Sequence, residues 1–319
     1  MRRIGIVLKN EQLFDKHLFK SVLLLICACS LWSCSVNPAT GDRQFTAFLP
    51  AEREAGIGAK EHTKVEQTFG NFMQGPIADY VSRIGKKIIA NTERKDVQYK
   101  FFVIDSPIVN AFAVPGGYIY VSRGLLALAN DEAELAAVLA HEVGHITARH
   151  AAERVSQGFL VGLGAAILAA AVDSPHAGKA AGVGSDLYIK SYSRGQEHQS
   201  DKLGVRYLSR AGYDTKAMAS FLQSLDAQKK LEARLSGKKN SGKFNYFSTH
   251  PLTEDRVIQA SAETDNYPKD PSVSNRNSYL RMIDGLVYGD SADQGFIRNN
   301  HFYHTQLDFT FSVPKGPKK

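Results

Sequence analysis

The stretch "LAHEVGHITARH", residues 139–150, holds three histidines and a glutamate within ten positions. His141 and His145 are four residues apart, and Glu142 follows the first of them. On a helix, a step of four residues brings the two imidazoles onto one face, where both can reach a single ion at about 2.0–2.1 Å. A carboxylate beside that ion can take a proton from a metal-bound water. The spacing therefore predicts an H-E-x-x-H metal site, and the alternative is an ordinary helix with surface histidines.

A catalytic zinc ion takes three protein ligands and a water, so a third ligand is needed. His150 lies nine residues after His141, which on a continuous helix is a net rotation of about 180°. Ala148 and Ala151 occupy the Gly and His positions of the longer H-E-x-x-H-x-x-G-x-x-H pattern. We therefore expect His150 to be a solvent or packing residue, and we expect the third ligand to come from another helix.

The segment "SRGQEHQSDKLG", residues 193–204, offers that ligand. Glu197 and Asp201 are four apart and share a helix face. Glu197 can bind the metal through its carboxylate, and Asp201 can accept the free N–H of a ligand histidine or help proton transfer. His198, about 100° around the helix from Glu197, is the alternative ligand. An acidic pair on a solvated helix face is the alternative for the pair as a whole.

The surrounding pattern predicts an α+β fold that is mainly α. Apolar spacing, capping residues and turn signals predict helices at 51–66, 76–90, 131–156, 187–211, 214–234 and 277–286, and strands at 97–105, 111–114, 118–122 and within 296–313. Pro115 favours an edge position, because it has no N–H to donate. The uncharged run "GFLVGLGAAILAAAV", residues 158–172, is too short to span a bilayer. We expect a buried or cleft-side helix there, with dipping into a membrane as the alternative.

The first 33 residues resemble a lipoprotein signal peptide. A basic start precedes the apolar run "VLLLICACSLW", and "LWSCS" resembles the lipobox in which Cys34 is lipidated. Cys29 is a weaker competitor, and a plain cleaved signal peptide is the alternative. The chain has three cysteines in its 319 residues, and cleavage before Cys34 leaves one, so we expect no disulfide. We predict a tether at 34–50.

The charge argues against one class of partner. The formal net charge is +7, and five Lys/Arg against two Asp/Glu in the leader leave about +4 for the rest. This mild surplus is not gathered in one long basic run, so we expect no nucleic-acid partner.

Several segments together resemble the M48 family of zinc metallopeptidases. They are "HEVGH", "SRGQEHQSD" about fifty residues later, "NAFAVPGGYIYVSRGLL" before the motif, "THPLTEDRV" after it, and "CSVNPATGDRQF" at the lipobox. The resemblance covers about residues 34–310. It implies a zincin-like domain at 51–265 with a small edge-exposed sheet and a long HExxH helix, followed by a small extension at 266–319. Relatives often continue into a larger tetratricopeptide-type module. We expect no such module after "FSVPKGPKK", so a scaffold-docking role is not implied.

The resemblance also implies roles for named residues. One zinc ion would be held by His141, His145 and Glu197, with Glu142 as the base and Asp201 as a supporting or proton-donating residue. The strand and turn before the motif would pair with an extended peptide substrate, which implicates Asn110, Ala111, Phe112, Ala113, Pro115, Gly116 and Gly117. We further hypothesise that His250 stabilises the oxyanion or occupies the open zinc position in a latent state, although it could simply pack at a helix entry.

These features predict a zinc-dependent endopeptidase of the bacterial envelope. It is similar to periplasm-facing lipoproteins of the outer membrane that degrade unfolded or misassembled periplasmic and outer-membrane proteins in Gram-negative bacteria. Ser35 after the lipidated cysteine favours the outer membrane by analogy. The competing class is a chaperone-like or assembly-assisting lipoprotein whose zinc site is silent or latent.

Overall fold

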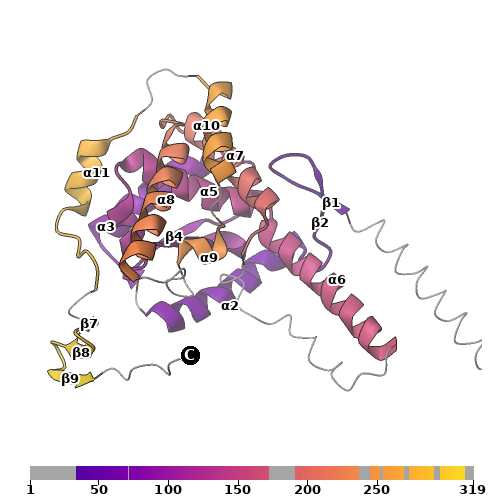
Figure 1. Cartoon of the computed structure of the whole chain (residues 1–319). Coiled ribbons are helices and arrows are strands. Elements are labelled where there is room, and N and C mark those ends of the chain that lie inside the picture. Colours follow the sequence, from indigo (N-terminus) through magenta and orange to yellow (C-terminus); the bar gives the residue numbers. More distant parts are fainter. Residues whose placement is uncertain are drawn as a thin grey trace, which may run out of the picture.

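A four-stranded sheet is the part of the fold on which the H-E-x-x-H helix packs (Figure 1). The computed structural model describes residues 34–70, 72–171, 191–236, 245–251, 254–268, 273–290 and 295–312. Its central sheet has the order β3 (Phe72–Met73), β4 (Lys100–Ile104), β6 (Tyr118–Ser122) and β5 (Ala111–Val114). β4 and β6 are parallel and the other pairs are antiparallel. β5 is an edge strand, and the predicted strands at 111–114 and 118–122 are confirmed.

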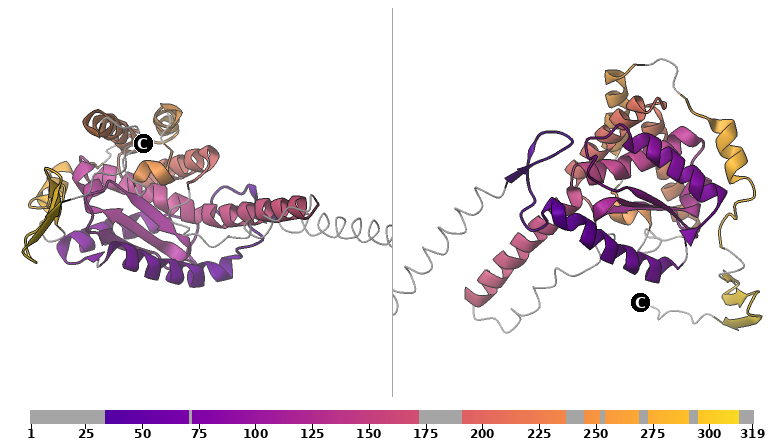
Figure 2. Two further views of the ribbon diagram at one scale, coloured as in Figure 1. Left: turned by 60° about the horizontal axis from the view of Figure 1, so that its bottom comes forward. Right: turned by 180° about the vertical axis from the view of Figure 1, so that it is seen from behind.

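Helices cover both faces of this sheet, as Figure 2 shows. Side chains alternate along β5, so Phe112 faces α2 (Ala51–Phe69) while Ala111 and Ala113 face the opposite layer. That opposite layer contains α3 (Pro76–Ile89) and α5 (Glu132–Thr147). The mainly helical α+β fold predicted from the sequence is therefore confirmed.

The remaining helices pack on α5, on the helices beside it or on the sheet. The described residues include α4 (Arg123–Leu128), α7 (Arg194–Arg210), α8 (Ala217–Ser236), α9 (Tyr246–Thr249), α10 (Glu254–Glu263) and α11 (Arg276–Ile283). α7 makes the most extensive packing with α5, and α8 packs on α5 as well. A separate sheet near the C-terminus contains β7 (Phe296–Arg298), β8 (His301–His304) and β9 (Phe309–Ser312).

α7 begins later than its sequence pattern predicts. The expected start at residue 187 lies outside the described residues, but 191–193 are not helical. Ser193 accepts a hydrogen bond from the backbone N–H of Gln196, and the Gln196 side chain accepts one from the backbone N–H of Ser193. This capping box stops the helix from extending further toward the N-terminus.

The predicted continuous helix at 131–156 is wrong, because it is two helices. α5 ends at Thr147 and α6 runs from His150 to Ala171. Arg149 between them has a left-handed backbone with φ of 57°. Its side chain is buried, and it donates to Glu54 Oε1 at 2.7 Å and to the backbone carbonyl of Leu49 at 2.8 Å. These contacts come from a distant segment, and they stabilise a break that local helix propensity would not produce.

We expect Arg149→Ala to lower the free energy of unfolding by about 3 kcal/mol, because it removes one partner of a buried ion pair. This loss is at the low end of the about 3–5 kcal/mol that breaking a buried ion pair typically costs. Glu54 keeps a partner in the variant, because Arg94 still donates to it at 3.1 Å. Urea denaturation measures the effect. Arg53→Ala, on the exposed side of α2, is the matched control and should change stability by no more than about 0.5 kcal/mol. Equal stabilities for the two variants would contradict the role of Arg149.

α6 also departs from the prediction of a buried or cleft-side helix. It projects away from the body of the molecule (Figures 1 and 2). Phe159, Leu160 and Val161 are 39%, 43% and 73% exposed. Among the described residues, no helix is both long enough and apolar enough to span a bilayer.

The segment at 34–50, which we predicted as a tether, is folded. β1 (Cys34–Val36) pairs with β2 (Arg43–Phe45) as an antiparallel hairpin. Asn37 and Leu49 are buried, and the backbone N–H of Phe48 donates to the Ser156 hydroxyl of α6 at 3.1 Å. The predicted leader at 1–33 lies outside the described residues.

Candidate metal centre

His141, His145 and Glu197 meet between α5 and α7, and all three are buried. The Nε2 atoms of the two histidines are 3.0 Å apart. Glu197 Oε1 lies 3.4 Å from His145 Nε2, and Glu197 Oε2 lies 3.7 Å from His141 Nε2. The helical spacing thus places both rings on one side, and the third candidate ligand comes from a different helix, as the sequence predicts.

His250 joins this group from the end of α9. Its Nδ1 lies 3.0 Å from Glu197 Oε1 and 3.3 Å from His141 Nε2. The four residues each offer one ligand atom, and these atoms all lie within 4.8 Å of one another. The His250 ring stacks on Tyr246 at 4.5 Å between centroids. His250 is therefore a fourth member of the cluster and not a remote helix-entry residue.

The arrangement of the cluster fits a bound cation. His141 Nδ1 lies 2.8 Å from Asp201 Oδ1, and Nε2 is the ring nitrogen that faces the cluster. The Nε2 atoms of His141 and His145 are 3.0 Å apart, a separation at which two lone pairs would repel each other unless a proton or a metal ion lies between them. Two imidazoles and a carboxylate are a donor set that suits zinc. Asp201 occupies the position predicted for it, beside a candidate ligand ring.

Arg256 on α10 is a residue that the sequence argument missed. It is buried, and it donates to both Asp201 oxygens at 2.7 and 2.8 Å and lies 2.6 Å from Glu197 Oε2. Burial alone would raise the pKa of both carboxyls. The guanidinium holds the pKa of Asp201 below its usual range, and His250 together with the guanidinium holds the pKa of Glu197 well below its usual range. The residue type and its place in "TEDRV" gave no signal of this contact, which depends on tertiary packing.

Glu142 is fully buried beside the cluster but does not belong to it. Its Oε1 lies 3.4 Å from His250 Nε2. Burial raises the pKa of the Glu142 carboxyl, and the nearby His250 and His141 rings offset part of this rise. A carboxylate with a raised pKa next to a cation site is suited to accept a proton near neutral pH.

The sequence profile described as peptidase family M48 matches residues 78–264, which is more than half of the chain. The chain belongs to peptidase family M48. The matched range includes every member of the cluster and Arg256, and the zincin-like fold expected from the resemblance is confirmed.

The chain is similar to several curated M48 relatives. It is 31% identical over 212 residues to the beta-barrel assembly-enhancing protease of Yersinia pestis, covering 63% of this chain and 42% of that protein. The corresponding protein of Escherichia coli K12 is 30% identical over 195 residues, covering 58% and 38%. The mitochondrial metalloendopeptidase OMA1 of Schizosaccharomyces pombe is 33% identical over 225 residues, covering 69% and 63%. This chain therefore spans about two fifths of the length of the first two relatives.

The predicted substrate-binding residues do not all lie in the same environment in the structure. Ala113, Pro115 and Gly116 line a small recess together with His145 and Tyr192. The Phe112 side chain packs instead against Tyr120 on the other face of the sheet, and Gly117 lies against the backbone of Gln98. Asn110 is buried, and its N–H donates to Ser122 Oγ at 2.9 Å. Ala113, Pro115 and Gly116 therefore lie beside His145 of the cluster, whereas the Phe112 side chain and Gly117 do not.

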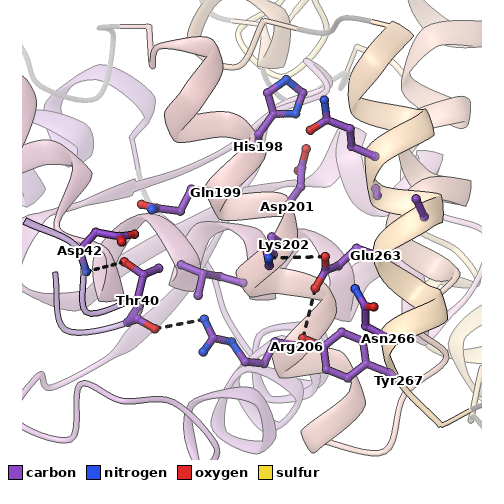
Figure 3. Close-up of a pocket in the computed structure, with 15 residues that line it drawn as sticks. Thr40, Asp42, His198, Gln199, Asp201, Lys202, Arg206, Glu263, Asn266 and Tyr267 are labelled. Carbon is purple, nitrogen blue, oxygen red and sulfur yellow. Dashed lines mark hydrogen bonds and ion pairs between the residues drawn. The ribbon is translucent and has the colours of Figure 1, made fainter.

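His198, the alternative ligand, lies outside the cluster. Figure 3 shows it on α7 at the wall of a cavity between the N-terminal hairpin, α7 and α10. The cavity has a volume of about 770 Å³. His198 Nε2 is 4.0 Å from Asp255 Oδ2. Asp201 and Gln199 also line this cavity, whereas the candidate ligands themselves do not.

Close packing of α5 on α7 sets the separation of the candidate ligands. A Cβ added at Gly144 would lie 2.7 Å from Ser200 Oγ and 3.1 Å from its carbonyl oxygen. We expect Gly144→Ala to push the helices apart, to cost about 1–3 kcal/mol of stability and to weaken zinc binding. In Gly56→Ala, the matched control on the exposed side of α2, the new methyl meets no described atom within 4 Å. Thermal unfolding and zinc titration compare the two, and equal zinc affinities would contradict this packing account.

Proposed function

We propose that this M48 protein is a zinc-dependent endopeptidase. The observation that carries the proposal is the buried cluster of His141, His145 and Glu197, with the Glu142 carboxylate beside it but outside the ligand set. This combination separates ion binding from proton transfer, as hydrolysis by an activated water requires. The family and the names of the relatives, a protease and a metalloendopeptidase, support the same reading.

The chain's own residues have distinct roles in this proposal. His141, His145 and Glu197 would hold one zinc ion, which when bound polarises the scissile carbonyl and lowers the pKa of its water. Glu142 accepts the proton of the attacking water and delivers it to the leaving amine. Asp201 orients the His141 ring, and Arg256 holds Asp201 and Glu197 in place.

The substrate in this proposal binds as an extended strand along β5. β5 is the edge of its sheet, and an added strand would gain main-chain hydrogen bonds there with little dependence on sequence. The short α9 flanks this edge, because the backbone N–H of Tyr246 donates to the carbonyl of Val109 at 3.0 Å. We propose unfolded or misassembled proteins of the bacterial envelope as the substrates, because this binding mode depends little on sequence and one relative is named a beta-barrel assembly-enhancing protease.

Lipidation of Cys34 is the proposed anchor to the outer membrane, facing the periplasm. The exposed apolar residues of α6 support a membrane location, because they lie beside the hairpin that begins at Cys34. Phe48, which follows the hairpin, contacts Phe159 with ring centroids 3.9 Å apart. Cys34→Ala should abolish labelling with a radioactive fatty acid, and labelling that persists would point to Cys29 instead.

The position of His250 favours a second possibility for the resting state. Its Nδ1 lies close enough to the candidate ligands to fill the coordination position that a catalytic water needs. The same protein could then act as a latent peptidase or as an assembly-assisting lipoprotein until His250 moves. In that case His250→Ala raises peptidase activity, whereas a loss of activity would favour the role of His250 as an oxyanion donor.

The experiment that tests the proposed function uses the purified chain and a chemically unfolded protein labelled for fluorescence. We expect fragments to accumulate, to stop forming after zinc is removed with a chelator, and to form again after one equivalent of zinc is restored. Degradation that continues at the same rate in the metal-free chain would overturn the proposal. Zinc binding without any fragmentation, by wild type and by His250→Ala alike, would favour the chaperone-like alternative.

A further inference from the structure

His150 is the one histidine of "HEVGHITARH" that helix geometry removes from the metal site, and the structure brings it back. The break at Arg149 turns the start of α6, so His150 does not lie on the far side of α5. Its ring is buried, with an exposed fraction of 1%. His150 Nδ1 lies 2.8 Å from His145 Nδ1, the ring nitrogen that faces away from the cluster. Of the two expected positions for His150, solvent or packing, the structure shows a packed one, and it lies beside a candidate ligand where a continuous helix would not place it.

The hydrogen bonds around His150 allow a single consistent arrangement when His145 binds a metal through Nε2. A neutral imidazole that binds a metal through Nε2 carries its proton on Nδ1. His145 Nδ1 must then donate, and His150 Nδ1 must accept. His150 in turn carries its proton on Nε2, which lies 2.7 Å from the acceptor Gln199 Oε1. Each donor in the series meets an acceptor.

The N-terminal hairpin contacts the last side chain of this series of hydrogen bonds, Gln199. Asn37 Nδ2 donates to the same Gln199 Oε1 at 3.2 Å. Asn37 is itself fixed, because its Oδ1 accepts from the backbone N–H of Ala39 at 2.9 Å and its backbone N–H donates to the carbonyl of Asp42 at 2.7 Å. A residue three positions after Cys34 is thus connected to the metal centre through two side chains.

We propose that His150 is the positioning residue for the candidate ligand His145, and that Gln199 and the hairpin residue Asn37 hold it in place. The two candidate histidine ligands then have different partners. His141 is oriented by the Asp201 carboxylate, whereas His145 is oriented by a neutral imidazole. Tyr192 completes the support of His145, since its ring stacks on that imidazole at 3.6 Å between centroids. This inference rests on the proposed function, because it requires His145 to be a metal ligand.

The test measures zinc affinity, by competition with a chromogenic chelator, alongside thermal unfolding of the metal-free chain. We expect His150→Leu, which keeps the volume but removes the acceptor, to weaken zinc binding about 10–100-fold, as removal of such partners typically does. His150→Asn places an amide oxygen near the former Nδ1 and should recover most of the affinity. His198→Leu is the matched control, a histidine outside the cluster, and should bind zinc like wild type.

A purely structural role for His150 gives a different pattern. It would lower the unfolding temperature of the metal-free His150→Leu chain and leave the zinc affinity within about twofold of wild type, which would overturn the proposal. If His150→Leu does not fold, Gln199→Ala and Asn37→Ala carry the test, and both should weaken zinc binding and shift the visible spectrum of the cobalt-loaded chain. Unchanged affinity and spectrum in both would also overturn it. Absence of zinc binding in wild type would be distinguishable, since it removes the proposed function itself.

Discussion

Glu142→Gln is expected to lower kcat/KM on an unfolded protein by about 10²–10⁴-fold while one zinc ion stays bound, because an amide cannot accept the proton of the attacking water. Glu142 lies beside the ligand cluster and is not a member of it, so the loss should affect chemistry and not metal content. Fragment formation and zinc analysis on the same preparation measure both quantities. A variant that cleaves at the wild-type rate would sink the assignment of Glu142 as the base.

Glu142 also predicts how the peptidase activity changes at acid pH. The base must be ionised, and burial raises the pKa of the Glu142 carboxyl above the ordinary value of 4.5. As the pH is lowered, the activity of the wild-type chain should therefore begin to fall at a higher pH than it would if the base were a glutamate with an ordinary pKa. The residual activity of Glu142→Gln should lack this acid limb. If the activity of the variant falls at the same acid pH as that of the wild type, the fall is caused by a group other than Glu142.

Arg256→Met is expected to produce the largest loss of stability among the substitutions considered. It leaves the buried carboxylates of Asp201 and Glu197 without their shared cation, and breaking a buried pair in this way typically costs about 3–5 kcal/mol. Zinc binding should weaken as well, because Glu197 and the Asp201 that orients His141 both lose a fixed partner. Urea denaturation of the metal-free chain and zinc titration measure the two effects separately.

Arg210→Met is the matched control for Arg256. Arg210 also pairs with a carboxylate, Glu93 at 2.9 Å, but its side chain is 43% exposed. Surface pairs contribute about 0–1 kcal/mol, so this variant should remain close to wild type in stability and in zinc affinity. If Arg210→Met and Arg256→Met are equally stable, the buried guanidinium does not organise the centre.

The parts of the site that follow from local geometry could be predicted from the sequence. The four-residue spacing of His141 and His145 needs only a helix, and the acidic pair at Glu197 and Asp201 needs only another. The strands on either side of Pro115 follow from a turn signal with short apolar runs beside it. The break after Thr147 could not be predicted, because residues 46–54 stabilise Arg149 from more than ninety positions away in the chain.

That one break accounts for two wrong expectations. A continuous helix would have placed His150 on the opposite side of α5, and the break brings its ring against His145. The same break directs α6 outward, so that an apolar run expected to be buried carries exposed side chains such as Val161. Arg256 was missed for a related reason: a single arginine in a helical pattern is usually solvated, and its burial depends on where α10 packs.

The central claim is that His141, His145 and Glu197 hold zinc and that Glu142 does not, and zinc stoichiometry after dialysis tests it most directly. The wild-type chain and Glu142→Gln should each retain one zinc ion per chain. His141→Ala and Glu197→Gln, which removes the carboxylate charge with little change of shape, should lose it under the same conditions. Retention of one zinc ion at wild-type affinity by both ligand variants would contradict the account.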